Sequence, residues 1–171
     1  MRIAASFLLL ILLTLGSANA QLTQSSDVLK LGEDMPEFTI LSLEGKELSS
    51  EELYGKVVLI NFFATWCPPC KRELPELEKE VWTKYKDRED FVLMIISREE
   101  VSGKVLEFVK ENKYAMPFYL DPKREVYNLF ATKNIPRNYL FDKQGRLMLH
   151  SMGFKQSEFD TMVSEIEELL K

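Results

Sequence analysis

An apolar run followed at once by two cysteines constrains this chain more than any other stretch. The run Val57–Phe63 has the pattern of a buried strand, and Thr65–Cys70 follows it with the sequence TWCPPC. A helical pattern then begins at Lys71. A helix start presents free N–H groups and the positive end of the helix dipole, which both favour a thiolate over a thiol. The spacing of Cys67 and Cys70 also lets the two sulfurs close a disulfide, so the stretch predicts a redox-active pair.

The sequence gives less support to two other roles for this cysteine pair, a structural zinc site and a structural disulfide. A structural zinc site needs four ligands, and the chain has only two cysteines and one histidine, His150. A purely structural disulfide between Cys67 and Cys70 would close a very short loop and remove little chain entropy. We therefore expect redox chemistry, with no metal and no other cofactor.

Residues 1–20 have the pattern of a secretory signal peptide. Arg2 supplies a positive charge, Phe7–Leu13 is an unbroken apolar run, and Ala18–Ala20 is a small-x-small cleavage site. The apolar run is shorter than the about 20 residues that a membrane-spanning helix needs, so a retained membrane anchor is the weaker alternative. We expect export to the periplasm or another compartment outside the cytoplasm, with cleavage near Ala20.

Charge and cysteine use narrow the class of protein further. The formal net charge is −5 over 171 residues, and the basic residues are spread rather than clustered, which argues against nucleic-acid binding. Exported proteins commonly use cysteines for stapling disulfides, yet both cysteines here belong to one motif. This use indicates a working pair on a fold that is stable without it.

The remaining patterns predict one α/β domain over residues 34–171, preceded by a flexible polar leader at 21–33. Apolar runs predict strands at 34–41, 57–63, 91–96, 117–120, 139–141 and 146–150, with turns around Gly45 and across 142–145. Apolar stripes at helical spacing predict helices through 71–85, 105–109, 126–130 and 159–170. This alternation of strands and helices indicates a mixed sheet flanked by helices.

Several local signals predict where helices begin or bend. Ser49–Leu53 predicts a helical turn with a serine at its cap. Pro75 lies inside a helical pattern, where it removes one backbone hydrogen bond and kinks the helix. Asp121–Pro122 predicts a capped helix start with proline in the first helical position. Ser157 with Asp160 is similar to a capping box and predicts the start of the last helix.

Residues 34–171 resemble the TlpA/ResA-like group of exported bacterial thiol–disulfide oxidoreductases, which are related to AhpC/TSA proteins. Trp66–Lys71 matches the active-site motif of that group, and Pro75 falls where thioredoxins kink their active-site helix. Residues 36–58 resemble the N-terminal hairpin that the group shares with peroxiredoxins. The resemblance implies a thioredoxin-like fold with an N-terminal β-hairpin extension, and an enzyme that exchanges disulfides with protein partners.

Glu73 is the candidate proton carrier. Thioredoxin has a buried aspartate six residues before the first cysteine, where this chain has Asn61. The TlpA/ResA-like group shares the asparagine and has an acid three residues after the second cysteine, which corresponds to Glu73. One helical turn separates Glu73 from Cys70, so the two side chains can face the same side. Spacing alone favours an exposed helix glutamate, whereas the resemblance favours proton handling.

We place the partner-binding surface at Trp66, Pro68, Ile135 and Pro136. The resemblance implies a cis bond before Pro136 and an exposed Trp66, although Arg137 stands where the family often has threonine. Ile135 would then offer free backbone groups beside the sulfurs, where an extended segment of a partner can pair by strand addition. The alternative is that Pro136 simply opens an edge strand.

Three other functions compete with disulfide exchange. A peroxidatic cysteine of a peroxiredoxin has Thr or Ser three residues earlier, whereas Ala64 precedes Cys67 at that distance. Copper-carrying thioredoxin folds usually have three residues between their cysteines, which disfavours a site that adds His150 to the pair. A redox-inert binding module would not need both cysteines. A disulfide oxidase or isomerase remains open, because it would use the same surface.

The direction of electron flow is expected to be reductive. The resemblance implies a reductase that is supplied with electrons by a membrane partner. Its substrate stays open, because apocytochrome c, another envelope enzyme and general disulfide traffic are all compatible with the sequence. Pro68 and Pro69 have no backbone N–H, so two first-turn donors that could stabilise a Cys67 thiolate are missing. A weaker thiolate means a more stable disulfide and a lower reduction potential.

Overall fold

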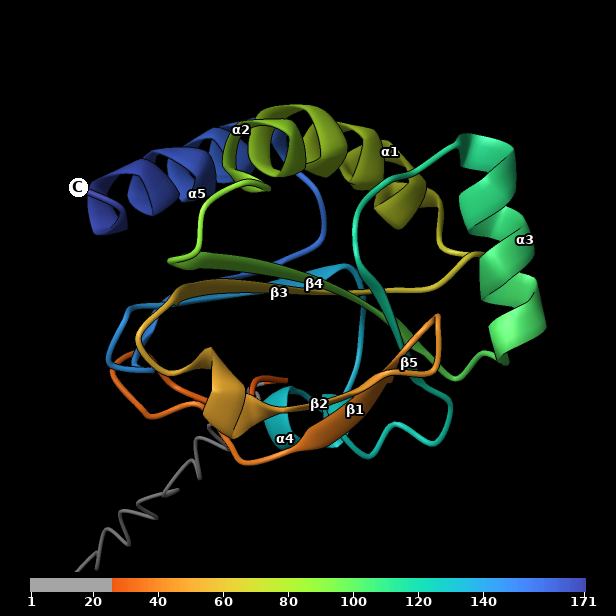
Figure 1. Cartoon of the computed structure of the whole chain (residues 1–171), viewed down its shortest axis with the longest axis horizontal. Helices are drawn as coiled ribbons and strands as arrows, with labels where there is room; N and C mark the ends of the chain where they lie inside the picture. Colours follow the sequence, from red (N-terminus) through yellow and green to blue (C-terminus); the bar gives the residue numbers. More distant parts are fainter. Residues whose placement is uncertain (1–25) are drawn as a thin grey trace, which may run out of the picture.

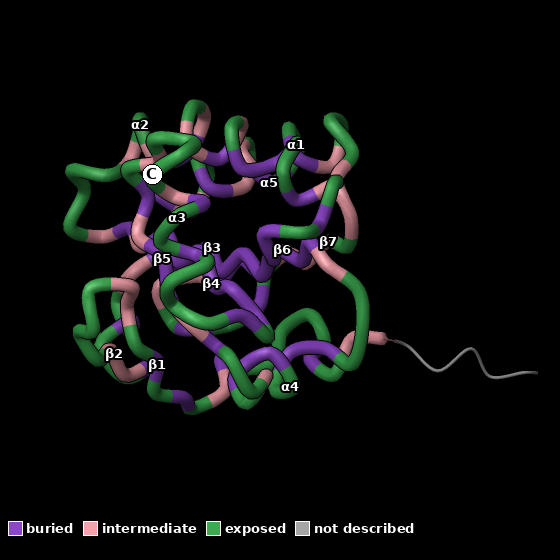
Figure 2. Tube along the Cα trace, turned by 90° about the vertical axis from the view of Figure 1, so that its right-hand side faces the viewer, coloured by how far each residue is buried: buried purple, intermediate pink, exposed green. Residues whose placement is uncertain are grey.

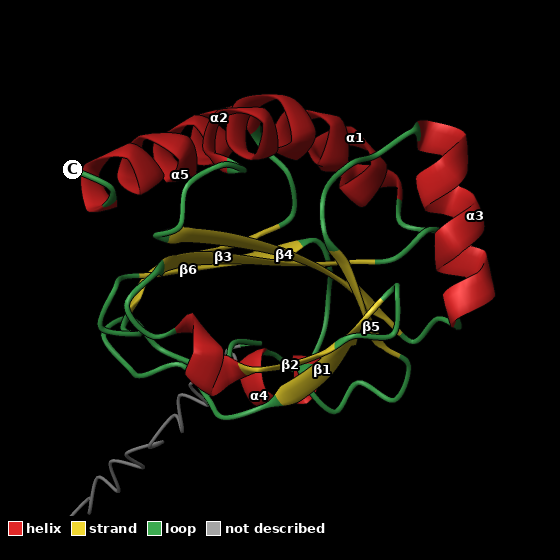
Figure 3. Ribbon diagram, in the orientation of Figure 1, coloured by secondary structure: helices red, strands yellow, loops and turns green. Residues whose placement is uncertain are grey.

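A seven-stranded sheet forms the centre of the protein in the computed structural model, which describes residues 26–171 (Figures 1 and 3). The strands lie in the order β2-β1-β5-β4-β3-β6-β7. The pairs β3–β4 and β4–β5 are parallel and the other four are antiparallel, so the predicted mixed sheet is confirmed. The signal-peptide prediction lies outside the described residues.

The strands and helices have the following bounds. The strands are β1 (Thr39–Ser42), β2 (Glu47–Ser49), β3 (Val57–Phe63), β4 (Phe91–Arg98), β5 (Phe118–Asp121), β6 (Arg137–Phe141) and β7 (Leu147–Met152). The helical elements are η1 (Ser50–Leu53), α1 (Pro68–Glu76), η2 (Leu77–Trp82), α2 (Thr83–Tyr85), α3 (Ser102–Asn112), α4 (Tyr127–Phe130) and α5 (Gln156–Leu169). None of the helices in the described part of the chain is long and apolar enough to cross a membrane.

The central strand β3 is buried on both faces because helices and loops cover both sides of the sheet (Figure 2). Alternate β3 residues enter two apolar clusters. Val57, Leu59 and Phe63 pack with side chains of α1, α3 and α5, whereas Val58, Ile60 and Phe62 pack with η1, α4 and β6. Asn61 is the one polar residue of β3, and by this alternation it points toward the α1 face.

The predicted N-terminal hairpin and its helical turn are confirmed. β1 and β2 pair in antiparallel register, with Gly45 in the left-handed backbone region (φ +82°) between them. Ser49 caps η1, and its backbone N–H donates in return to the Glu52 carboxylate, which completes a capping box. The hairpin joins the sheet because β1 pairs with β5.

The active-site helix changes from α-helical to π-helical hydrogen bonding just after its proline. Pro75 lies in the last turn of α1, and the chain continues without a break through the π-helical turn η2 into α2. A proline cannot donate to the helical ladder, and π-helical turns are one way in which a helix absorbs such a defect.

Two predicted helix starts are wrong. Asp121 is the last residue of β5 and Pro122 lies in a turn, while α4 begins only at Tyr127. The Asp121 carboxylate instead accepts the Tyr127 N–H at 2.7 Å, because the turn brings these residues together. The α5 cap is Lys155, without a side-chain cap bond, so Ser157 already lies inside the first turn.

The described part of the predicted leader, residues 26–33, contacts the rest of the domain. Asp27 forms a β-bridge with Ala131. Leu29 is buried in the apolar cluster that contains Val58 and Ile60. The Gly32 N–H donates to the Leu147 carbonyl at 2.8 Å. The polar composition hid these contacts, because one buried leucine and a few backbone hydrogen bonds are enough to anchor a short segment. The folded domain therefore begins before residue 34.

Candidate active site at the cysteine pair

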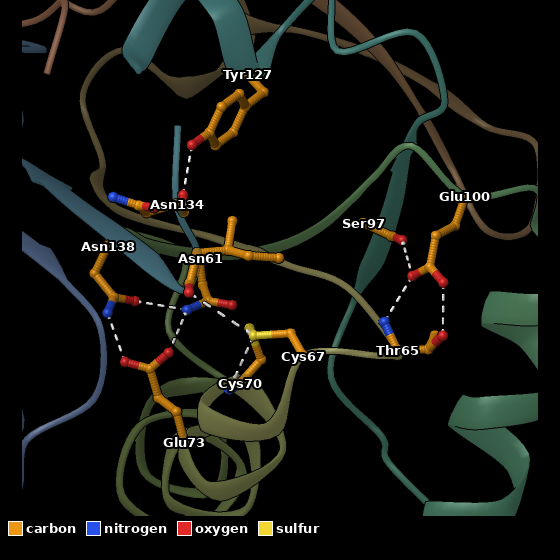
Figure 4. Close-up of a disulfide and its surroundings, with 11 residues drawn as sticks. Asn61, Thr65, Cys67, Cys70, Glu73, Ser97, Glu100, Tyr127, Asn134 and Asn138 are labelled. Carbon is orange, nitrogen blue, oxygen red and sulfur yellow. Dashed lines mark hydrogen bonds between the residues drawn. A yellow bond between two sulfur atoms is a disulfide. The ribbon is translucent and has the colours of Figure 1, made fainter. Parts of the chain in front are cut away.

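Cys67 and Cys70 form a disulfide at the N-terminus of α1 (Figure 4). Cys67 is the residue that caps the helix, and its sulfur accepts the Cys70 N–H at 3.3 Å. Pro68 and Pro69 occupy the first two helical positions and have no N–H. The Cys70 amide is therefore the first-turn donor to this sulfur. Cys67 is 2% exposed and Cys70 fully buried, so the first cysteine is the more accessible of the two.

Glu73 lies inside the protein, one turn beyond Cys70, so the alternative of an exposed helix glutamate is wrong. Its carboxylate accepts Asn61 Nδ2 at 2.9 Å and Asn138 Nδ2 at 2.6 Å (Figure 4). Burial raises the pKa of Glu73 to about 7, and the hydrogen bonds from Asn138 and Asn61 oppose this rise without cancelling it. Glu73 can thus gain or lose a proton near neutral pH, as a proton carrier must.

The loop before β6 lies against the disulfide. The Ile135–Pro136 peptide bond is cis, and the Ile135 carbonyl oxygen is 3.8 Å from Cys67 Sγ. The Tyr127 hydroxyl donates to the Asn134 carbonyl at 2.5 Å and holds the loop from the other side (Figure 4). The structure therefore brings Ile135 and Pro136 together with the cysteines, although they are far away in the sequence.

The other two residues expected at the partner surface are exposed beside the disulfide. Trp66 is 54% exposed, and Pro68 is exposed at the first position of α1. A large exposed aromatic side chain next to a reactive group is typical of a contact surface. Its role in binding stays a prediction.

Sequence reasoning missed Glu100, which holds the loop in front of the cysteines. Its carboxylate accepts both the backbone N–H and the hydroxyl of Thr65 at 2.6 Å, and the Ser97 hydroxyl at 3.1 Å (Figure 4). Lys104 Nζ lies 2.7 Å away. Burial raises the pKa of Glu100, but the hydrogen bonds from Lys104, Thr65 and Ser97 outweigh it and leave this pKa below its ordinary value. Glu99–Glu100 looks like an ordinary solvated acidic pair in the sequence, so nothing there signals this role.

Asn138 is the second functional residue that sequence reasoning missed. It lies opposite Asn61 in the antiparallel pairing of β3 with β6, and this register brings its amide to Glu73. Its Nδ2 also donates to Ser151 on β7 at 3.2 Å. The signal in the sequence was its place two residues after Pro136, directly before the strand expected at 139–141.

His150 lies on β7, where its ring stacks on Tyr139 and its Nδ1 is 3.5 Å from an Asp27 oxygen. Among residues 26–171, no three or more His, Cys, Asp or Glu side chains are grouped so that they could hold a metal ion. The local contacts of His150 are those of a strand residue in a polar cluster.

A thioredoxin-like sheet, a Cys-x-x-Cys disulfide at a helix start and a cis-proline loop beside it define a thiol–disulfide oxidoreductase of the thioredoxin fold. The chain belongs to the AhpC/TSA family, whose model matches residues 31–150. The resemblance in the sequence to this class is confirmed, and so is the enzyme class.

Known relatives agree with this class. The chain is 29% identical over 143 residues to the thiol–disulfide oxidoreductase ResA of Bacillus thuringiensis, covering 84% of this chain and 78% of the relative. It is 30% identical to ResA of Halalkalibacterium halodurans, covering 83% and 78%. A solution structure of a candidate protein disulfide isomerase from Bacteroides thetaiotaomicron matches with a TM-score of 0.82 and 37% identity, over 85% of this chain and 92% of that one.

Proposed function

We propose that this protein reduces disulfides in partner proteins outside the cytoplasm. A Cys67 thiolate attacks one sulfur of the partner disulfide and releases the other as a thiolate, which forms a mixed disulfide. Cys70 then attacks Cys67, which restores the Cys67–Cys70 disulfide and leaves the partner as a dithiol. Two electrons pass from the cysteine pair to the partner.

Glu73 handles the proton in this proposal. Cys70 must lose a proton before it can attack, and it is fully buried, so water does not reach it freely. Glu73 lies one turn further along α1 and has a pKa of about 7, so its carboxylate is a suitable acceptor at neutral pH. The partner's leaving sulfur takes up the released proton equivalent.

The observation that carries the reductive direction is the shortage of donors to Cys67. Pro68 and Pro69 leave the Cys70 N–H as the first-turn donor, and the Ile135 carbonyl oxygen faces the same sulfur. A carbonyl oxygen disfavours negative charge on a neighbouring sulfur. A poorly stabilised thiolate makes the disulfide harder to reduce, and therefore gives the dithiol more reducing power.

Partner binding is proposed at the loop that carries Ile135, with Trp66 and Pro68 on the neighbouring exposed surface. Strand pairing with main-chain groups needs no particular partner sequence, which suits an enzyme that reads a disulfide rather than a motif. The signal-peptide pattern at 1–20 supports a location in the cell envelope. There a membrane protein would supply electrons. Apocytochrome c, another envelope enzyme and general disulfide traffic are all compatible substrates.

Equilibration with glutathione tests the direction. A potential near about −270 mV, the thioredoxin value, would support a reductase, and one more oxidising than about −180 mV would contradict it. Cys67→Ser should abolish turnover, while Cys70→Ser should accumulate mixed disulfides that identify partners. A peroxide-consumption assay distinguishes the thiol peroxidase alternative, which Ala64 disfavours because it has no hydroxyl to orient a peroxide.

A further inference from the structure

Arg137, the residue directly after the cis-proline, is completely buried. A buried guanidinium is costly unless its charge is paired and its donors are satisfied. Disulfide exchange as described above makes no use of it. Its contacts therefore need another explanation.

The guanidinium closes the docking loop, residues Lys133–Ile135, onto the strand that follows it. Arg137 Nε and Nη2 donate to the Lys133 carbonyl oxygen at 3.1 and 3.0 Å. The backbone of Arg137 is itself fixed on both sides, by pairing with Phe62 of β3 and Met152 of β7. The beginning of the loop is thus tied to the rigid centre of the sheet.

Two of the three consecutive carbonyl groups of the docking loop are held by hydrogen bonds, and the third faces the disulfide. Lys133 bonds to Arg137, Asn134 accepts the Tyr127 hydroxyl, and the Ile135 oxygen faces the Cys67 sulfur at 3.8 Å. The first two contacts leave the loop little freedom to rotate its peptide groups. They therefore set the direction in which Ile135 presents its backbone.

The counter-charge comes from the N-terminal segment, residues Ser26–Leu29. Arg137 Nη1 donates to the Asp27 carboxylate and Nη2 to the Ser26 hydroxyl. Backbone bonds fix the segment independently, since the Thr132 N–H donates to the Ser26 carbonyl and the Val28 N–H to the Phe130 carbonyl, both at 2.9 Å.

Asp27 also receives the Tyr139 hydroxyl at 3.2 Å and lies 3.5 Å from His150 Nδ1. Neighbouring donors that converge on one carboxylate hold it in place beside the guanidinium. This part of the predicted leader therefore helps to support the docking loop, and is not a passive extension.

We propose that Arg137 is a positioning residue for partner binding and that Asp27 completes it. This inference rests on the proposed docking of partner proteins at Ile135. The donor described for the Cys67 sulfur is the Cys70 amide, and the contacts of Arg137 lie with the loop, the N-terminal segment and neighbouring strands. Loosening the loop should thus weaken the recognition of protein disulfides without changing the intrinsic chemistry of the pair.

Two disulfide probes separate recognition from chemistry. Insulin is a protein disulfide that needs docking, whereas 5,5′-dithiobis(2-nitrobenzoate) is a small disulfide that does not. Arg137→Lys keeps the charge but lacks the planar fork that bonds Asp27 and Lys133 at once. Asp27→Asn keeps the shape and removes the counter-charge. Both variants should lose about tenfold in kcat/KM toward insulin, mainly through KM, as expected for the loss of one charge-assisted hydrogen bond.

The same variants should react with the small probe at the wild-type rate and reach the wild-type equilibrium with glutathione. Asp90→Asn is the matched control. Asp90 lies just before β4, at the end of the sheet opposite the cysteines, where its carboxylate binds Arg88 and Lys143. Its substitution should therefore leave the reaction rates with both probes unchanged. Circular dichroism verifies that each variant is folded. If Arg137→Lys does not fold, the kinetics of Asp27→Asn alone test the inference.

Unchanged insulin kinetics in folded Asp27→Asn would overturn the inference, and so would an equal loss toward both probes. Failure of the proposed function looks different. In that case the wild-type protein reacts with the small probe but not with insulin. The docking role of Arg137 is then rejected together with the proposed function.

Discussion

Two buried glutamates lie on opposite sides of the disulfide in the view of Figure 4, and their surroundings push them in opposite directions. Glu73, on the helix side, is held by two neutral amides, and its pKa rises to about 7. Glu100, on the loop side, is held by Lys104 and by the donors of Thr65 and Ser97, and its pKa falls. The comparison shows that the depth of burial and the number and charge of the donors together decide whether an acid keeps its proton.

The largest expected effect is the change in the free energy of unfolding with pH that the titration of Glu73 causes. Its folded pKa of about 7 lies above its unfolded value of 4.5, so folding favours the protonated acid. This contribution is full below pH 4.5 and is lost as the pH rises through 7, a change of about 3 kcal/mol. Urea unfolding between pH 4.5 and 8 should show this loss in the wild type and not in Glu73→Gln.

Glu76→Gln is the matched control for that series, because Glu76 lies on the same helix but is partly exposed. Its unfolding curve should follow the wild type at every pH. A wild-type slope that survives in Glu73→Gln would show that another group titrates, and the contrast with Glu100 would be lost.

The next effect is on turnover. Glutamine keeps the shape of Glu73 but cannot carry a proton, so Glu73→Gln should reduce insulin reduction about hundredfold, a typical loss for one general acid–base group. Mixed-disulfide formation by Cys67 should be affected less than its resolution by Cys70. Wild-type turnover in Glu73→Gln would assign Glu73 to the stability of the fold alone.

Glu100 sharpens the comparison through a smaller effect with the opposite pH dependence. Its lowered pKa means that its stabilisation is present above the unfolded pKa and is lost as the pH falls. In Glu100→Gln the side chain offers the two Thr65 donors one acceptor oxygen instead of two. The free energy of unfolding should therefore fall by about 2 kcal/mol at pH 7. Urea unfolding at pH 7 and pH 4 measures both quantities, and the variant should approach the wild type at the lower pH.

The smallest effect is on alkylation of reduced Cys67. An ionised Glu73 opposes a neighbouring thiolate by like charge, whereas the protonated acid does not. The rates of wild type and Glu73→Gln with iodoacetamide should therefore coincide well below pH 7 and separate above it, with the variant faster. The two rate curves should differ only above pH 7, and identical curves throughout would show that the two groups do not interact.

Local sequence patterns predicted the parts of the fold that local physics controls. Val57–Phe63 could be recognised as a buried strand because every position in it except Asn61 is apolar. Gly45 could be recognised as the turn between β1 and β2 because glycine readily adopts the left-handed backbone conformation found there. The start of α4 was missed because the Asp121 carboxylate reaches forward to Tyr127 across a turn. Such a contact is set by tertiary structure and not by helix propensity.

The site shows the same division. The cysteine pair is a contiguous motif, so spacing and chemistry together identify it. The strand register places Asn138 beside Glu73, and Glu100 reaches Thr65 from the loop after β4; neither contact follows from a local sequence pattern. The Arg137–Asp27 pair spans 110 positions in the chain, and no local pattern relates two residues that far apart.

The amide partners of Glu73 also determine the shape of its titration. Asn61 and Asn138 carry no charge at ordinary pH, so in the disulfide form this acid should follow a single-site curve that salt barely alters. Reduction adds two sulfurs that can ionise nearby, and interacting groups give broadened or biphasic curves. The carboxyl resonance of Glu73 is therefore a built-in gauge: its departure from one-site behaviour measures how much negative charge the reduced cysteines hold.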